Sequence, residues 1–308
     1  MSERKPKVVV VGSFMMDLVI KAERRPKKGE TLIGQQFGMF GGGKGNNQAI
    51  AAAWLGGDVT MVGRMGRDSF GDTLMDALVE EGVEVGFIVR DAEAGTGVAS
   101  PVIDADGDNS IIIVPRANMR LSAADVERAA SAISDSNVLL LQLEVPISAS
   151  QRAAEIAKSS GTKVILNPAP ARDLSDSFLS QVDILTPNQV ETEYLSGIKV
   201  SDSESAERAA RALLDRGVSA VILTLGDSGA LLFKRGMSTR IPAYKVDVVD
   251  TTAAGDAFCG ALAIGLARGE ALEDAVGFAN AAGALAVTAL GAAPSMPTAT
   301  QISEFLAS

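Results

Sequence analysis

Short, nearly continuous runs of Val, Ile and Leu alternate with helical patterns along most of this 308-residue chain. Such runs are typical of strands whose two faces are both covered by helices. Strands are expected at residues 7–11, 58–62, 138–143, 163–166, 183–185, 220–225 and 244–249. Helices are expected at residues 45–55, 69–81, from 122 onward, 148–159, 203–216 and 256–268. The alternation predicts an α/β fold built on a doubly wound, mostly parallel sheet.

Two segments break this alternation, at residues 17–40 and 96–114. We expect them to form one small antiparallel β-sheet that acts as a lid over the strand ends. The remaining residues then form the α/β core, namely 1–16, 41–95 and 115–308. The extended runs of the lid are expected at 18–22, 31–36, 97–103 and 110–114, with a hairpin turn at 104–108 between the last two. The outer face of such a lid needs a cover, which favours a homodimer contact there.

The composition excludes several kinds of site. The chain contains no histidine and a single cysteine, Cys259. Ser-His-Asp triads, His-ligated metals, an intramolecular disulfide and a thiolate zinc cluster are therefore excluded. The single cysteine, with no clear secretion signal, favours a cytoplasmic location.

The charge and hydropathy patterns also argue against two classes of partner. The formal net charge is −10 and no cluster of Lys and Arg stands out, which disfavours nucleic-acid binding. No stretch is typical of a membrane span, because the Ala/Gly-rich region after Asp274 favours a buried helix. We expect a protein that binds small molecules, without nucleic acid or membrane.

The segment from Asp250 to Asp256 joins an expected strand to an expected helix. Its small residues would allow an anion to approach the backbone N–H groups at the helix N-terminus, here those of Ala253, Ala254 and Gly255. Beside such an anion site, the carboxylate of Asp256 could accept a proton from a hydroxyl that attacks phosphorus. The same aspartate could also be an ordinary N-cap. The segment alone leaves both interpretations open.

A second glycine-rich segment lies at residues 41–48. Lys44 has the spacing of a Walker A motif, but Gly45 replaces the Ser or Thr that would hold Mg²⁺, and no clear strand precedes the loop. A Rossmann dinucleotide site is disfavoured too, because residues 11–16 lack the three spaced glycines. The loop could let a small polar ligand approach the backbone, with Lys44 and Asn47 supplying donors and acceptors. The alternative is a flexible turn before a helix.

A series of motifs spans nearly the whole chain and resembles the ribokinase-like (PfkB) family of sugar and nucleoside kinases. In order, the motifs lie at residues 12–17, 42–48, 96–98, 142–144, 167–171, 186–191, 224–229, 250–256 and 291–295. The two-alanine anion loop and the lysine-bearing glycine loop resemble the ribokinase branch of the family more than its nucleoside kinases.

The resemblance implies an ATP-dependent kinase that phosphorylates the 5-hydroxyl of ribose and gives ribose 5-phosphate. Asp256 would be the base, and the anion hole would be formed by the amides of Ala253, Ala254 and Gly255. The implied sugar-binding residues are Met15, Asp17, Gly43, Lys44, Asn47, Glu144 and Asp256. The implied nucleotide-binding residues are Asn188, Thr224, Gly226, Asp227, Ser228, Gly229, Gly255 and Asn280.

The resemblance also implies Mg²⁺ and a monovalent activator, K⁺. Glu191 would help hold Mg²⁺ through water, since Mg²⁺ keeps several of its waters. The implied K⁺ residues are Asp250, Thr252, Ala286, Ala289, Gly291 and Ser295. Structural alternatives stay open for several of these polar residues: a solvated helix acid for Glu191, a satisfied core amide for Asn280, and ion pairs for Asp17 and Glu144.

Three positions depart from the family pattern. Met15 stands where related bacterial enzymes carry Asn, and a thioether offers a sugar hydroxyl no useful hydrogen bond. 2-Deoxyribose, with one hydroxyl fewer, is therefore a competing substrate, followed by other pentoses and nucleosides. Asn46 and Arg116 replace the more familiar Ala and Gly. Hypotheses from other classes are a catalytically silent sugar- or nucleotide-binding regulator on the same scaffold, and a dehydrogenase.

Overall fold

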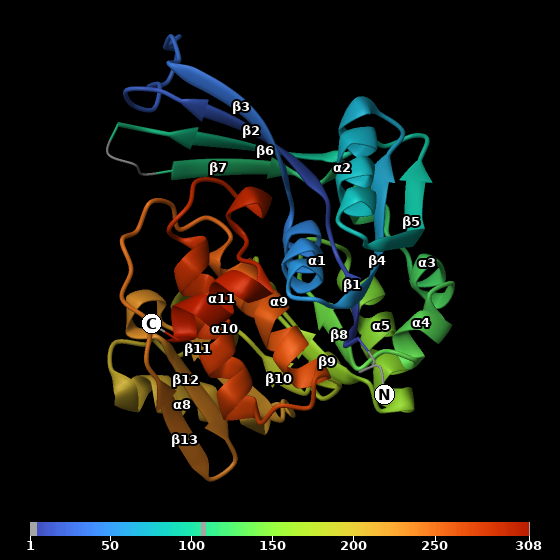
Figure 1. The fold of residues 1–308 in the computed structure, drawn as a ribbon, viewed down its shortest axis with the longest axis vertical. Helices are drawn as coiled ribbons and strands as arrows, with labels where there is room; N and C mark the ends of the chain where they lie inside the picture. Colours follow the sequence, from blue (N-terminus) through green and yellow to red (C-terminus); the bar gives the residue numbers. More distant parts are fainter. Residues whose placement is uncertain (1–4, 106–108, 308) are drawn as a thin grey trace.

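The computed structural model describes residues 5–105 and 109–307 of the chain. Within these residues a nine-stranded sheet forms the centre of the fold (Figure 1). Its strands are, in spatial order, β13 (Met237–Ile241), β12 (Ala230–Lys234), β11 (Ala220–Thr224), β10 (Ile184–Leu185), β9 (Lys163–Leu166), β8 (Val138–Leu141), β1 (Lys7–Val11), β4 (Asp58–Gly66) and β5 (Glu84–Asp91). Neighbouring strands run parallel from β11 through β10, β9, β8, β1 and β4 to β5. At the other edge, β12 pairs antiparallel with β11 and β13 pairs antiparallel with β12.

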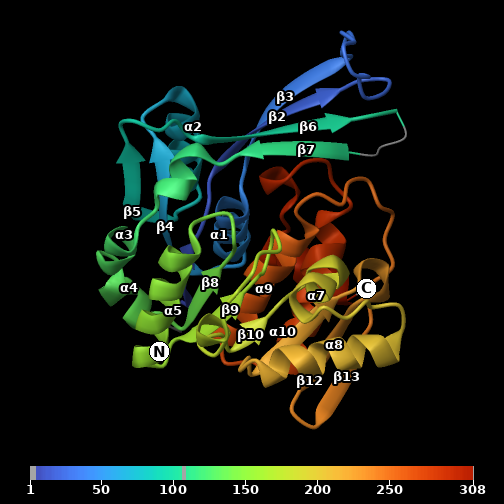
Figure 2. The same ribbon diagram turned by 180° about the vertical axis from the view of Figure 1, so that it is seen from behind.

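Helices cover both faces of this sheet. One face carries α1 (Lys44–Trp54), α2 (Ser69–Glu80), α9 (Ala254–Ala267), α10 (Leu272–Ala286) and α11 (Ala299–Ala307) (Figure 1). The other carries α3 (Ala123–Glu127), α4 (Ala130–Ser134), α5 (Ile147–Ser160), α6 (Asp176–Leu179), α7 (Gln189–Ser196) and α8 (Ser203–Asp215) (Figure 2). Three short 3₁₀ helices lie in the connections: η1 (Arg116–Arg120), η2 (Gly226–Ser228) and η3 (Ala293–Ser295).

The central strand β1 shows why its sequence is an uninterrupted run of valine. Val8 and Val10 pack into the core under α1, α9 and α10, whereas Val9 and Val11 pack into the core under α3 to α5. A strand buried on both sides has no polar face. The expected doubly wound, mostly parallel fold is confirmed. Among the described residues, no helix has the length and hydrophobicity that a bilayer crossing needs.

A second, four-stranded sheet stands over the carboxyl ends of the parallel strands (Figures 1 and 2). Its order is β3 (Gln36–Gly42), β2 (Met15–Lys21), β6 (Gly97–Ile103) and β7 (Asn109–Val114). β2 pairs antiparallel with β3 and β6 antiparallel with β7, while β2 and β6 run parallel to each other. We call this sheet the lid. Part of the expected hairpin turn, residues 106–108, lies outside the described residues.

Two expected strands are wrong. The lid strand is not at 31–36 but at Gln36–Gly42, so a strand does precede the glycine-rich loop. The overlooked signal was the alternation of Phe37 and Met39 with smaller residues. Residues 244–249 form no strand either: the chain leaves the edge strand β13, and the Val249 N–H donates to the carbonyl of Val287 at the end of α10 rather than to a neighbouring strand.

Candidate active site

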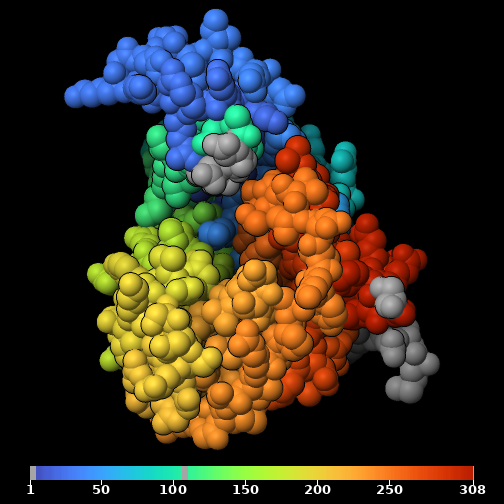
Figure 3. All heavy atoms as spheres, turned by 90° about the vertical axis from the view of Figure 1, so that its left-hand side faces the viewer, coloured from blue at the N-terminus to red at the C-terminus, as the bar shows by residue number. Residues whose placement is uncertain are grey.

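The candidate site lies at the carboxyl ends of β1 and β8, beneath the lid. β4 lies on one side of β1 and β8 on the other, so the order of the strands reverses at this point. Ligands of doubly wound folds bind in the crevice at such a reversal. Figure 3 shows the surface hollowed below the lid at this end of the molecule.

Asp256 lies buried in the first turn of α9, with about 5% of its surface exposed. Its Oδ2 accepts a hydrogen bond from Nδ2 of Asn47 and its Oδ1 accepts one from Nε2 of Gln48, each at 2.9 Å. The N-cap of α9 is Ala253, so the alternative that Asp256 is merely a helix cap is wrong. The carboxylate is instead held by two amides of α1.

The backbone before Asp256 turns sharply. Ala253 has φ 61° and ψ 6°, a left-handed conformation that residues other than glycine rarely adopt. Within the described residues, the N–H groups of Ala253 and Gly255 have no hydrogen-bond partner, while that of Ala254 lies 3.4 Å from the Thr251 carbonyl. Strained backbone of this kind often lies at functional sites. Two unpartnered N–H groups at a helix N-terminus form a suitable site for an anion.

The glycine-rich loop packs directly on the chain that follows β1. Gly43 has φ 90°, and a Cβ there would lie 2.8 Å from the backbone N of Met15. Oε2 of Glu144 accepts hydrogen bonds from the Lys44 backbone N–H at 2.9 Å and from Oγ of Ser13 at 2.5 Å. Glu144 therefore orders this loop, and among the described residues it forms no salt bridge. The position of Ser13 inside the first motif was the only sequence signal for its role.

Burial and like charges shape the electrostatics of the site. Burial, followed by the nearby Glu144 and Asp256 carboxylates, raises the pKa of Asp17 to about 7. Burial lowers the pKa of Lys44, but the carboxylates of Asp256, Glu144 and Glu191 outweigh it and leave that pKa raised. The site therefore combines a permanent cation with a group of carboxylates, one of which is partly protonated at neutral pH.

Met15 is the first residue of the lid strand β2 and is buried. Its sulfur is 3.7 Å from Nδ2 of Asn118. The Asn118 amide also pairs with the backbone of Phe14, accepting from its N–H at 2.9 Å and donating to its carbonyl at 2.7 Å. The thioether thus accepts a weak hydrogen bond from an amide that also pairs with the backbone of Phe14.

A second group of residues lies at the carboxyl ends of β10 and β11. Asn188 caps α7 and forms a reciprocal capping box with Glu191, which is buried rather than solvated. Burial raises the pKa of Glu191, against the opposing Asn188 N–H and Lys44. Thr224 ends the neighbouring strand β11, and its N–H donates a hydrogen bond to the Pro187 carbonyl at 3.0 Å. These ends lead directly into η2, which contains Gly226, Asp227 and Ser228 and is followed by Gly229.

The remaining predicted residues lie around α10, apart from this group. Nδ2 of Asn280 donates to the carbonyls of Ile241 and Pro242, at 3.3 and 3.0 Å. The NH₂ group of this buried amide is therefore satisfied within the protein. Asp250 accepts hydrogen bonds from the N–H groups of Thr252 and Gly291, at 2.9 and 3.0 Å. Asp250 thereby joins two segments in which the other predicted K⁺ residues lie, Ala286, Ala289 and Ser295.

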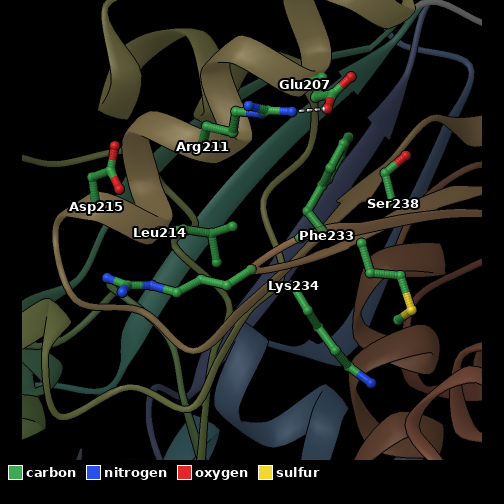
Figure 4. Close-up of a pocket in the computed structure, with 10 residues that line it drawn as sticks. Glu207, Arg211, Leu214, Asp215, Phe233, Lys234 and Ser238 are labelled. Carbon is green, nitrogen blue, oxygen red and sulfur yellow. Dashed lines mark hydrogen bonds and ion pairs between the residues drawn. The ribbon is translucent and has the colours of Figure 1, made fainter.

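A surface hollow of about 390 Å³ lies elsewhere, between α8 and the β12–β13 hairpin (Figure 4). It is at the amino ends of the parallel strands, opposite the lid. Arg211 in its wall already pairs with Glu207, and Lys234 pairs with Glu273. We assign no chemistry to it.

Comparison with known proteins identifies the family to which this fold belongs. The model of the pfkB family of carbohydrate kinases matches residues 5–299. The chain belongs to this family. It is 42% identical to the ribokinase of Haemophilus influenzae over 97% of this chain and 98% of that one. It is 38% identical to the deoxyribokinase of Salmonella typhi over 97% and 98% of the two chains.

The solved structures agree with this membership. The structure of Arabidopsis thaliana ribokinase complexed with ribose and ATP superposes with a TM-score of 0.91, at 34% identity, and covers 98% of this chain and 99% of that one. This pfkB-family chain is therefore a carbohydrate kinase by family, which excludes the dehydrogenase hypothesis.

Proposed function

We propose that this chain is a ribokinase, which transfers the γ-phosphate of ATP to the 5-hydroxyl of D-ribose and gives ribose 5-phosphate. One observation carries the proposal: a buried, amide-held carboxylate, Asp256, follows directly on the unpartnered N–H groups of Ala253 and Gly255. The ribokinase relatives and the complex of the Arabidopsis enzyme with ribose and ATP support the choice of substrates.

In this mechanism Asp256 accepts the proton of the sugar hydroxyl as the oxygen attacks the γ-phosphorus. The N–H groups of the anion loop stabilise the charge on the transferring phosphoryl group. Lys44 stays protonated because the carboxylates of Asp256, Glu144 and Glu191 surround it, and it adds a positive charge to the site. The lid above the site excludes water and so limits ATP hydrolysis.

The sugar would be held on the floor of the site and under the lid. Oδ1 of Asn47 is buried without a partner within the described residues and is the acceptor left for a sugar hydroxyl. Asp17 and Glu144 offer further acceptors, since Oε1 of Glu144 accepts no hydrogen bond within the described residues and Asp17 lies near Glu144 and Asp256. Gly43 lets the sugar approach the backbone.

ATP would lie along the ends of β10 and β11, where Asn188, Thr224 and residues 226–228 are exposed or half-buried and Gly229 is buried. We retain Asn280 as a contact on the adenine side. Both oxygens of Glu191 already accept from Asn188, which fits a Mg²⁺ held through water better than direct coordination. Bound Mg²⁺ would offset the charge of the phosphates.

A monovalent cation, K⁺, fits the paired segments next to the anion loop. Asp250 holds residues 250–252 against Gly291, so backbone carbonyls from both segments, together with Ser295, would surround the ion. The supporting observation is this tie between two loops. The single, fully buried Cys259 suits a reducing compartment, and we place the protein in the cytoplasm.

The outward face of the lid supports a homodimer. The strand pairings place Ile20, Phe37, Met39, Ile112 and Val114 on the face opposite Asp17. All five side chains are exposed, Ile112 to 72% and Phe37 to 66%. An apolar face of this kind marks an interface, and two copies related by a twofold axis would cover each other's lid.

A coupled assay of ADP release, run with ribose, 2-deoxyribose, other pentoses and nucleosides, tests the function. Ribose should give the highest kcat/KM. A preference for 2-deoxyribose would favour the second candidate, deoxyribokinase. The buried Met15 supports this candidate, because a thioether offers a sugar hydroxyl no useful hydrogen bond. Sugar binding without turnover on any substrate would instead favour a silent binding regulator.

A further inference from the structure

Three buried amide side chains form a chain of hydrogen bonds that ends on Asp256. Nε2 of Gln142 donates to Oε1 of Gln48 at 2.6 Å, and Nε2 of Gln48 donates to Oδ1 of Asp256 at 2.9 Å. The same Nε2 lies 3.3 Å from Oδ1 of Asn167, whose Nδ2 donates to the Thr186 carbonyl at 3.1 Å. Gln48 and Gln142 are fully buried and Asn167 nearly so.

The ionised carboxylate fixes the direction of this chain. A carboxylate only accepts, so Gln48 must turn its NH₂ group toward Asp256 and its carbonyl oxygen toward Gln142. Gln142 must then present its own NH₂ group. As a result, Oε1 of Gln142 is buried without a partner within the described residues. An unsatisfied buried carbonyl destabilises a fold, so the arrangement favours Asp256 at a cost in stability.

The neighbouring residue of the same helix completes the arrangement. Nδ2 of Asn47 donates to Oδ2 of Asp256, so each carboxylate oxygen has an amide donor. A proton on either oxygen would face an N–H group and would remove an accepted hydrogen bond. The two donors therefore fix the plane of the carboxylate.

We propose that Gln48 is a positioning residue for the base, and that Gln142 and Asn167 hold Gln48 in the orientation that serves it. The proposal rests on the proposed function, because it concerns the protonation state of Asp256 during phosphoryl transfer. Gln48 lies behind the carboxylate and acts on the reaction only through it.

The charged and titratable groups near Asp256 come from four other elements or connections and from α9 itself. They are Asp17 on β2, Lys44 on α1, Glu144 after β8, Glu191 on α7 and the thiol of Cys259 on α9. A neutral substitution at Gln48 leaves all of them in place. A change in the pH profile of such a variant therefore reports the lost N–H donor.

The test compares Gln48→Met, which keeps the length and removes the hydrogen bonds, with the parent enzyme over a range of pH. We expect kcat to fall roughly 10- to 100-fold and the acid limb of its pH profile to move up by about one pH unit, because a charged-group hydrogen bond is lost. The KM for ATP should stay within about twofold. Gln142→Met should move the acid limb of the kcat profile in the same direction, by a smaller amount. This variant provides the test if Gln48→Met does not fold.

Thr162→Val is the matched control. Thr162 is buried and its Oγ donates to the carbonyls of Ile133 and Ser136, away from the site. This variant should lower the melting temperature and leave kcat and its pH profile unchanged. An unchanged acid limb in both Gln48→Met and Gln142→Met would overturn the proposal, even if both variants melt earlier.

A second measurement separates this proposal from the proposed function. If the parent chain phosphorylates no sugar, the proposed function fails. The melting temperatures of Gln48→Met, Asp256→Asn and the double variant then test whether Gln48 positions Asp256. Effects that fail to add support a direct coupling between the two side chains, and additive effects contradict it.

Discussion

The Asn47 side chain faces Asp256 with one end of its amide only: Nδ2 donates to the carboxylate at 2.9 Å, while Oδ1 is buried without a partner among the described residues. The same side chain therefore orients the base and leaves an acceptor for a hydroxyl. Its neighbour Asn46 is equally buried, yet neither Nδ2 nor Oδ1 has a partner there. The two asparagines offer a matched comparison.

Asn47→Ala should lower kcat/KM for ribose about 10- to 100-fold, since a hydrogen bond to a charged group contributes roughly 1.5 to 3 kcal/mol. Asn46→Ala should leave kcat/KM within about twofold and raise the melting temperature, because it removes an unsatisfied amide. Steady-state kinetics and thermal unfolding of both variants check this. Equal losses of kcat/KM in the two would contradict the assignment of Asn47.

Met15→Asn should sharpen the choice of sugar. The amide would offer the hydrogen bond that the thioether lacks, which is worth about 1 kcal/mol, or roughly a fivefold change. We expect the ratio of kcat/KM for ribose to that for 2-deoxyribose to rise by this factor. Met16→Leu, at the buried neighbour, should leave the ratio unchanged. No change in Met15→Asn would mean that this position does not set selectivity.

Asp17 makes folding stability depend on pH. Its pKa is raised to about 7 from 3.8, so the native state holds this proton more tightly than the unfolded chain does. The resulting stabilisation is full below pH 3.8 and is lost as pH rises through 7. Asp17→Asn should therefore gain stability over the parent as pH rises from 5 to 8, by at most about 3 kcal/mol, because about two of the pH units between the two pKa values lie in this window.

Denaturant unfolding at pH 5 and pH 8 measures that gain. Asp58→Asn, at an exposed carboxylate at the start of β4, is the control and should show no such trend. A gain for Asp17→Asn that is equal at both pH values would show that Asp17 titrates normally.

The oligomeric state tests the lid face. Phe37→Asp places a charge in the proposed interface and should convert the dimer into a monomer. Val79→Asp introduces the same charge at an exposed apolar residue of α2, outside the lid, and should leave the dimer intact. Light scattering after size-exclusion chromatography gives the mass of each. A parent chain that is monomeric at micromolar concentration would refute this interface.

The fold was predictable from the sequence mainly where strands are buried on both sides. β1, β8 and β9 are uninterrupted apolar runs, and their positions needed no tertiary information. β5 was missed because it is an edge strand with alternating exposure, and the β12–β13 hairpin because its outer strand is largely exposed. The strand proposed at 244–249 had a suitable pattern but no neighbouring strand to pair with.

The site was predictable only in part. Asp256 stood out beside a small-residue segment that begins a helix and Lys44 in a glycine-rich loop, whereas Glu144 was predicted from the family resemblance. The hydrogen bonds of Gln48 and Gln142 could not be predicted, since they join residues 208 and 94 positions apart and depend on how α1 meets α9 and β8. The start of α9 at Ala254, ahead of the aspartate, also depended on the left-handed turn at Ala253.

Turnover of Asp256→Asn with ribose and ATP tests the central claim most directly, because it removes the base and keeps the shape of the side chain. We expect the variant to fold and to bind ATP as the parent does, while kcat falls by about 10³ to 10⁴, the upper part of the range for loss of a general base and its positioning. A kcat within tenfold of the parent would contradict the assignment of Asp256 as the base.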